Sequence, residues 1–160
     1  MTAARNADEL EAQADALQQQ EDERIGMVTV DSAYLFTAPV QWLEPGTTLT
    51  WVNESGSHST TAYASANDRP DRIPANAEAW DSGVLTEEGA TFEHTFDEEG
   101  VYDYYCTPHE SLGMVARLVV GTPNIENSPA LAEPQSSLPD TAQEIIRGLN
   151  TLTVPMVGGN

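Results

Sequence analysis

The central part of the chain consists of short runs in which apolar and polar residues alternate, separated by turn-forming residues. A period of two places successive side chains on opposite faces and is typical of strands with one buried face. The stretch 64–79 interrupts the series and, being rich in turn formers, predicts a long loop that holds one helical turn. So many short strands predict an all-β fold, an antiparallel sandwich or barrel. The seven to eight expected strands are MVTVD (27–31), AYLFTAPV (33–40), TTLTWVN (47–53), HSTTAY (58–63), WDSGVL (80–85), TFEHTF (91–96), VYDYYC (101–106) and MVARLVV (114–120).

The two ends of the chain differ from this pattern. Residues 1–25 are polar and acidic, with some apolar residues at helical spacing, and predict a short helix or a disordered arm. Residues 121–139 contain four prolines and predict a linker. Asp140 is a candidate N-cap for an amphipathic helix over 140–152, which either packs on the sandwich or tethers the chain to a partner or an adjoining domain. The apolar face of this helix holds Ile145, Ile146, Leu149 and Leu152. The expected parts are an N-terminal arm (1–25), a β domain (26–121) and a C-terminal extension of linker and helix (122–160).

The charge of the chain is strongly negative and limits what it can bind. Acidic residues number 26 against 6 basic ones, the net charge is −20, and every basic residue is an arginine. Such a surface excludes nucleic acid, because phosphates need basic partners, and it disfavours anionic membranes. Self-repulsion destabilises a compact fold in dilute salt, whereas about 1 M salt shortens the Debye length to roughly 3 Å. The acidic excess and the lack of lysine together predict a halophilic protein.

Targeting signals are not visible in the sequence. No apolar run approaches the ~18 residues of a membrane span, and the first residues lack the basic head and apolar stretch of a signal peptide. We expect any signal or anchor to lie outside this sequence. The single cysteine, Cys106, excludes an internal disulfide and therefore does not report the redox compartment.

The segment YYCTPHESLGM holds three scarce side chains that can bind a metal. Cys106, His109 and Met114 form the pattern C-x2-H-x4-M in a loop between two predicted strands. A soft thiolate with a thioether suits copper, and a blue copper electron-transfer site combines two histidines and a cysteine with a distant axial methionine. The motif therefore predicts one copper ion per chain and requires a second histidine. The single cysteine excludes the two-cysteine CuA centre, and structural zinc favours more than one thiolate.

Two histidines can supply the missing ligand. His58 lies at a loop-to-strand junction, where a side chain can project from the end of a sandwich. His94 lies in the middle of a predicted strand and shares its face with Phe92 and Phe96, which favours a core or rim position. The sequence therefore favours His58 and leaves His94 as the alternative. Ordinary roles stay open too, as a loop histidine for His58 and as a core methionine for Met114.

Three stretches resemble the plastocyanins and their haloarchaeal relatives, the halocyanins. YDYYCTPHESLGMVARLVV is similar to the ligand loop of that family, LEPGTTLTWVNESGSHS to the strand and loop before its first histidine, and WDSGVLTEEGATFEHTFDEEGVYDYYC to its middle part. The resemblance covers roughly residues 27–121 and implies a cupredoxin-like Greek-key β-sandwich. Ser59 departs from the family, in which an asparagine usually supports the cysteine loop from this position; a serine can donate the same bond over a shorter reach. The copper ligands implied by the resemblance are His58, Cys106, His109 and Met114.

The resemblance also implies a one-electron carrier that is not an enzyme. In the family the second histidine, here His109, lies near the surface in an apolar patch, here with Pro108 and Leu112, and passes electrons to partners. Tyr105 either offers a second route or packs in the sandwich, and Glu110 is either a solvated acid or an unusual neighbour of the patch. We expect a monomer in an extracytoplasmic, cell-surface or membrane-associated location, with membrane-bound redox proteins of a respiratory-type chain as partners and no small-molecule substrate. The alternatives are a copper-binding accessory protein and a redox domain of a larger membrane-associated or multicopper enzyme.

Overall fold

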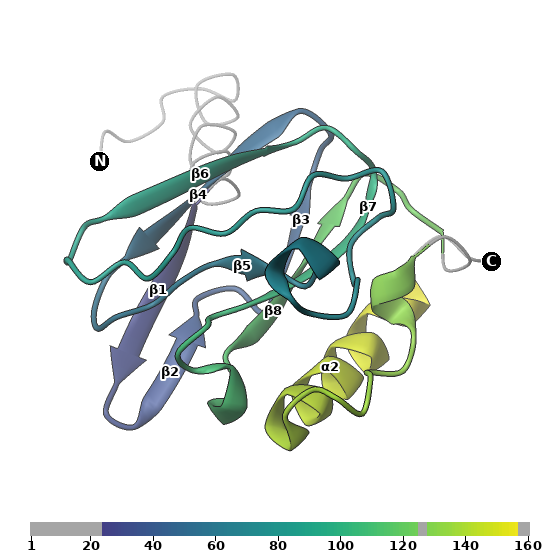
Figure 1. Ribbon diagram of the computed structural model, residues 1–160. Helices are drawn as coiled ribbons and strands as arrows, with labels where there is room; N and C mark the ends of the chain where they lie inside the picture. Colours follow the sequence, from purple (N-terminus) through teal and green to yellow (C-terminus); the bar gives the residue numbers. More distant parts are fainter. Residues whose placement is uncertain (1–23, 125–127, 157–160) are drawn as a thin grey trace, which may run out of the picture.

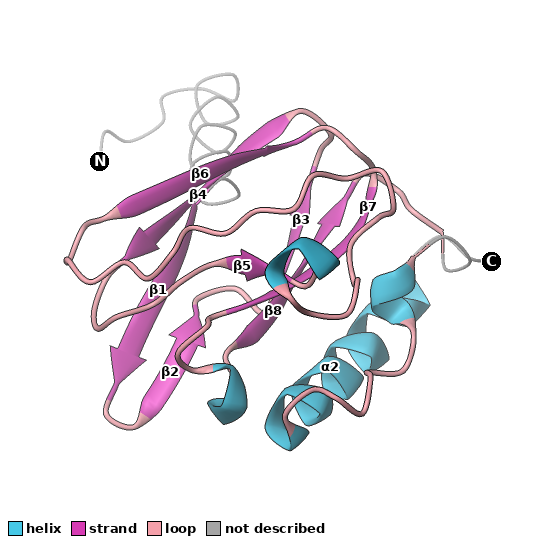
Figure 2. Cartoon of the chain, in the orientation of Figure 1, coloured by secondary structure: helices cyan, strands magenta, loops and turns pink. Residues whose placement is uncertain are grey.

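Two four-stranded sheets face each other and enclose the core (Figures 1 and 2). The computed structural model describes residues 24–124 and 128–156, so the predicted N-terminal arm lies almost entirely outside the described residues. The first sheet has the strand order β2-β1-β4-β6 and the second has the order β3-β8-β7-β5. The all-β sandwich predicted from the alternating pattern is confirmed. Its strands are β1 (Arg24–Val30), β2 (Ala33–Phe36), β3 (Val40–Leu43), β4 (Thr47–Asn53), β5 (Thr61–Ala62), β6 (Thr91–Phe96), β7 (Gly100–Tyr105) and β8 (Val115–Val120).

The prediction of purely antiparallel pairing is wrong for two strand pairs. β1 runs parallel to β4, and β3 runs parallel to β8, while the other neighbours are antiparallel. Parallel neighbours arise because the chain leaves the first sheet after β2, forms β3 in the second sheet and then returns as β4. The side-chain period is two in both kinds of pairing, so the sequence pattern does not distinguish them.

Three predicted strands differ from their sequence patterns. The run 33–40 is divided between β2 and β3, because Pro39 lies between them and has no N–H to donate. The run 58–63 retains only the two residues of β5. The run 80–85 forms no strand, because Gly83, with a φ of +70°, turns the chain there. Its remaining pairings are two isolated bridges, His58 with Leu85 and Thr61 with Asp81. The predicted helical turn in the loop after β5 is present as the 3-10 turn η1 (Ser65–Asn67).

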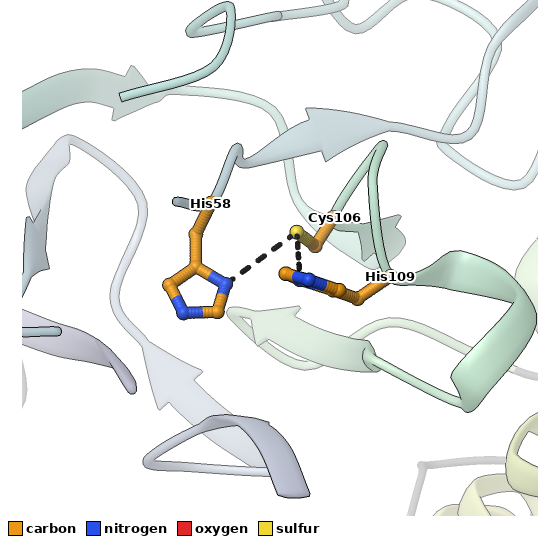
Figure 3. A group of neighbouring side chains, drawn as sticks. All are labelled: His58, Cys106 and His109. Carbon is orange, nitrogen blue, oxygen red and sulfur yellow. Dashed lines mark hydrogen bonds between the residues drawn. The ribbon is translucent and has the colours of Figure 1, made fainter. Parts of the chain in front are cut away.

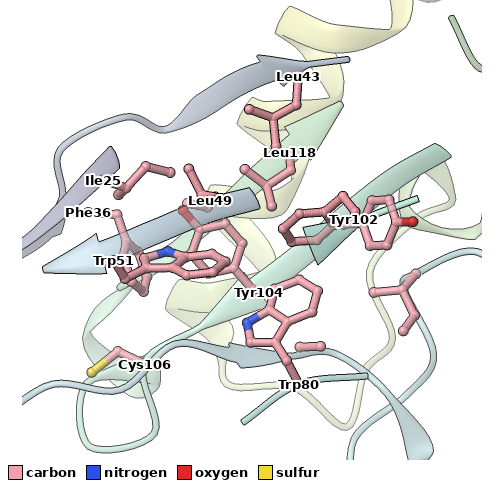
Figure 4. Packing of buried hydrophobic residues seen from close by; sticks show 14 of the residues in the cluster. Ile25, Phe36, Leu43, Leu49, Trp51, Trp80, Tyr102, Tyr104, Cys106 and Leu118 are labelled. Carbon is pink, nitrogen blue, oxygen red and sulfur yellow. The ribbon is translucent and has the colours of Figure 1, made fainter. Parts of the chain in front are cut away.

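Aromatic side chains fill much of the space between the sheets (Figure 4). Trp51 of β4 stacks on Trp80 with ring centroids 5.6 Å apart and meets Tyr104 of β7 edge-on at 5.4 Å. Such pairs contribute about 0.5–1.5 kcal/mol each beyond the gain from burial. His94 is half-buried against Trp80, at 5.1 Å, which agrees with the core or rim position that its strand context predicted. Cys106 belongs to the same cluster, so the packed core also fixes the residue that follows β7.

The C-terminal helix α2 (Asp140–Thr153) covers the outer face of the second sheet (Figure 1). Of its two predicted roles, the structure confirms packing on the sandwich. Asp140 is the first helical residue and Pro139 is the N-cap, so the predicted cap is displaced by one position; a carboxylate in the first turn still favours the helix dipole. The contact joins Ala142, Ile146 and Leu149 to Tyr63, Tyr105 and Val115. Within the described ranges, none of the helices has the length and apolar character that crossing a bilayer requires.

A buried ionic cluster binds the segment before α2 to the sandwich. Asp103 of β7 accepts hydrogen bonds from Arg72 at 2.9 Å and from Arg117 of β8 at 2.7 Å, and all three side chains are fully buried. Both guanidinium groups also donate to the backbone oxygen of Ala130, and Arg72 donates to that of Ala132 at 2.9 Å. The proline-rich segment that was predicted as a linker is therefore packed on the sandwich where the structure describes it.

Candidate metal centre

Three donor atoms converge at one end of the sandwich (Figure 3). His58 comes from the loop between β4 and β5, Cys106 follows β7, and His109 lies in the loop before β8. The Cys106 sulfur is 3.7 Å from Nδ1 of His58 and 3.5 Å from Nδ1 of His109. One ligand atom from each residue lies within 4.8 Å of the other two, and no other cluster of His, Cys, Asp and Glu in the described residues meets this condition. Atoms this close together can bind a single ion.

Backbone hydrogen bonds fold the loop between Cys106 and Met114 into a compact turn. The N–H of Cys106 donates to the oxygen of Met114 at 3.1 Å, and the N–H of Met114 donates to the oxygen of His109 at 3.2 Å. Gly113 ends the 3-10 turn η2 (Glu110–Leu112) with a φ of +91°, a left-handed conformation that favours glycine. The Met114 side chain is buried in the same core cluster as Cys106. The loop thereby brings the predicted fourth ligand to the same end of the core.

Ser59 supports the cysteine from the neighbouring loop. Its N–H donates to the Cys106 sulfur at 3.4 Å, and its hydroxyl accepts a hydrogen bond from the N–H of Thr107 at 2.8 Å. The same hydroxyl pairs with that of Thr61 at 2.9 Å, which orients it. Although Ser59 departs from the asparagine that is usual in the family it resembles, it does link the two loops that carry the predicted metal-binding residues.

Burial sets the protonation of the donors in the metal-free protein. It raises the pKa of the Cys106 thiol, and hydrogen bonds from the backbone of Ser59 and His109 partly oppose this rise. Burial lowers the pKa of His58, the charge of His109 lowers it further, and a hydrogen bond with the Ser55 backbone opposes both. Burial also lowers the pKa of His109. At neutral pH the imidazoles are therefore ready to bind through their lone pairs, whereas the thiol loses a proton when a metal binds.

Glu110, beside His109, belongs to a buried ion pair, so its interpretation as a solvated acid is wrong. Its side chain is 5% exposed, Arg69 binds it at 2.8 Å, and the Tyr63 hydroxyl donates to it at 2.8 Å. Tyr105 is also buried, with its ring 4.5 Å from that of Tyr63 and 5.0 Å from the Arg69 guanidinium. Packing is therefore the role that the structure supports for Tyr105, because α2 covers the sheet face on which it lies.

The β1–β2 hairpin supplies two further contacts to the histidines. Thr29 Oγ1 lies 3.0 Å from Nε2 of His58, and the ring of Tyr34 stacks on that of His109 with centroids 3.9 Å apart. The sequence analysis did not single out either residue. Alternation shows that side chains of one strand share a face, but nothing in the sequence aligns this hairpin with the two histidines.

The fold and the donor set together define a class of protein. A two-sheet sandwich with two histidines and a cysteine at one end, and a buried methionine in the same loop, is a metal-binding cupredoxin. A family model described as copper-binding proteins of the plastocyanin/azurin family matches residues 24–121. The chain belongs to this family, and its cofactor is copper.

Individual relatives agree with this assignment. The chain is 33% identical over 92 residues to halocyanin from Natronomonas pharaonis, covering 56% of this chain and half of the halocyanin. It is 32% identical over 91 residues to plastocyanin from Scenedesmus fuscus, covering 55% of this chain and 88% of the plastocyanin. Pseudoazurin from Methylobacterium extorquens AM1 has the same fold, with a TM-score of 0.60 at 21% identity, over 81% of this chain and 96% of the pseudoazurin. The predicted cupredoxin fold and the resemblance to the plastocyanins and halocyanins are confirmed.

Proposed function

We propose that this protein is a one-electron carrier that binds a single copper ion through His58, Cys106, His109 and Met114. The observation that carries the proposal is the convergence of two imidazole Nδ1 atoms on one sulfur, from loops 48 residues apart in sequence. A single thiolate with two imidazoles and a thioether matches copper, whereas structural zinc takes more thiolates. Copper bound by these donors supplies a centre that takes up and returns one electron.

The protein's own contribution is to hold the donors in one arrangement. The core fixes β7 up to Cys106, and the backbone bond from Cys106 to Met114 closes the ligand loop. Ser59 links this loop to the loop of His58. A site that is assembled before the metal binds has little to rearrange when the charge of the metal changes, which favours rapid electron transfer.

Exchange with a partner takes place on the His109 side of the site. His109 is half-buried, whereas His58 is fully buried, and Leu112 in the same loop is 59% exposed. Interfaces of electron-transfer proteins are small and transient. In concentrated salt the acidic surface is screened, so docking relies on apolar contact around His109. A rate of electron transfer that rises steeply as salt is removed would contradict this mode of docking.

The proposal extends to the setting in which the carrier works. Partners are membrane-bound redox proteins of a respiratory-type chain, and the protein is a halophilic monomer that acts outside the cytoplasm, at the cell surface or membrane. Support for the halophilic setting comes from the net charge of −20 and from the similarity to a halocyanin.

Copper binding can be tested by adding Cu(II) to the metal-free protein. We expect an intense visible absorption band, because charge transfer from a thiolate to Cu(II) is strong in this donor geometry. The Cys106→Ser variant should lose the band entirely. His94→Ala is the matched control, since it removes a histidine outside the cluster, and should keep the band. Loss of the band in His94→Ala, or its retention in His58→Ala, would contradict the assignment of the ligands.

A further inference from the structure

We propose that Thr29 and Tyr34, a cross-strand pair on the β1–β2 hairpin, position the two histidines that bind copper. The inference rests on the proposed function, because its subject is the orientation of the proposed ligands. In the register of the hairpin, Thr29 lies directly opposite Tyr34, so both side chains point to the same face. That face is the one that meets His58 and His109.

Thr29 fixes the ring of His58 through its outer nitrogen. Its hydroxyl lies 3.0 Å from Nε2, on the side of the ring away from Nδ1, which is 3.7 Å from the Cys106 sulfur. When Nε2 carries the proton and donates it to Thr29, the lone pair of Nδ1 is free for a metal. In that tautomer Thr29 and the Ser55 backbone, which also forms a hydrogen bond with His58, hold the ring with Nδ1 on the side of the cysteine.

The loop before His58 in turn holds Thr29 in place. The N–H of Thr29 donates to the hydroxyl of Ser55 at 2.8 Å, and that hydroxyl lies 3.2 Å from the backbone oxygen of Thr29. Gly56 permits the close approach, because a Cβ at this position would lie 2.3 Å from Thr29 Oγ1 and 3.2 Å from Nε2 of His58. Ser55 therefore holds the backbone of Thr29, and Gly56 leaves the room that its hydroxyl needs to reach Nε2 of His58.

Tyr34 fixes the ring of His109 by stacking on one of its faces. The centroids are 3.9 Å apart and the ring planes differ by 10°, while His58 meets the same tyrosine edge-on at 6.5 Å. His109 is half-buried and is the ligand nearest the surface, so it has the greater freedom to swing away from the metal. Tyr34 opposes this motion, since leaving the metal would break the stack.

The hairpin also provides its own control. Val28 and Leu35 form the neighbouring cross-strand pair, and alternation points them to the opposite face of the hairpin. Leu35 is 49% exposed and lies next to Tyr34 on the same strand. A substitution of Leu35 therefore changes the same hairpin without removing a side chain from the face that meets the histidines.

The test compares full-length variants by two measurements. Tyr34→Leu removes the aromatic ring, whereas Tyr34→Phe retains it. Thr29→Val removes the hydroxyl, whereas Thr29→Ser retains it. Leu35→Ala is the control on the opposite face of the hairpin. We expect Tyr34→Leu and Thr29→Val to release copper to a chelator about 2- to 10-fold faster, the range that follows from an aromatic pair or a single hydrogen bond. The conservative variants and Leu35→Ala should release copper at the rate of the original protein.

The second measurement uses the metal-free protein, so that it does not depend on copper binding. Nuclear magnetic resonance should show His109 ring protons shifted by the Tyr34 ring, a shift that Tyr34→Leu abolishes and Tyr34→Phe restores. The ring signals of His58 should shift in Thr29→Val and keep their positions in Thr29→Ser, because only the valine removes the hydroxyl that lies against Nε2. Unchanged histidine signals in the metal-free Tyr34→Leu and Thr29→Val variants, or release of copper at the original rate, would overturn the inference. Failure of the original protein to give the visible band would instead overturn the proposed function.

Discussion

Replacing Asp103 by asparagine should destabilise the fold strongly, because this one carboxylate balances two buried guanidinium groups. Asp103 accepts hydrogen bonds from Arg72 at 2.9 Å and from Arg117 at 2.7 Å and 3.0 Å, and the substitution weakens or removes them. The three side chains have no exposed surface. Removing one partner of a buried ion pair typically costs about 3–5 kcal/mol, because the other partner remains buried and uncompensated. An asparagine retains one acceptor oxygen but carries no charge, so it can accept part of these hydrogen bonds but cannot neutralise the two guanidinium groups.

Thermal unfolding followed by circular dichroism in concentrated salt would measure this loss. A change of about 1 kcal/mol shifts the midpoint by roughly 2–4 °C in chains of 150–250 residues, so we expect a decrease of about 6–20 °C. Glu133→Gln is the matched control, because it removes a carboxylate from an exposed pair with Arg147, in which the two side chains are 75% and 52% exposed. Exposed pairs contribute about 0–1 kcal/mol. Midpoints that fall equally in the two variants would refute the reasoning.

Three further predictions concern the ligand loop, pH and salt. Glu110→Ala should lower the free energy of unfolding by about 1–3 kcal/mol, since it leaves Tyr63 and Arg69 without their buried acceptor. Chemical denaturation would measure this loss, and an unchanged midpoint would argue against a stabilising role of Glu110. The metal-free protein should lose stability as pH falls from 7.5 to 5.5, because burial lowers the pKa of His94, as of His58 and His109, and the unfolded chain then takes up protons that the folded chain does not. The variant His94→Gln should lose less over the same range, and an equal loss would contradict this assignment. Transfer to dilute buffer should abolish the near-ultraviolet circular dichroism signal, because a net charge of −20 is then unscreened; full retention of the signal would contradict the expected need for salt.

The type of fold and the chemistry of the site were both readable from the sequence, because each depends on local pattern. Alternating apolar residues predicted most of the strands, and the spacing of Cys106, His109 and Met114 predicted copper before any fold was known. The strand context of His94 predicted a core or rim position, and the structure has it against Trp80. Such features can be predicted without tertiary information, because the residues that define each pattern lie within a few positions of one another in the sequence.

What lay beyond the sequence was decided by contacts between distant segments. The parallel pairing of β1 with β4, the burial of Glu110 under Arg69, the packing of Tyr105 beneath α2 and the docking of the proline-rich segment each join residues from separate elements. An acid next to a metal ligand looks the same in sequence whether it is solvated or paired. The pairing depends on which loop folds back over it.

The sequence by itself therefore determined most of the strands, the acidic surface and the identity of the metal, since alternation, charge and donor type are properties of the residues. Only the tertiary structure decided that His58 and not His94 meets the cysteine, and that Thr29 and Tyr34 lie against the two histidines. The physical reason is that strand register and sheet packing set these distances, and both depend on the whole core rather than on any one segment.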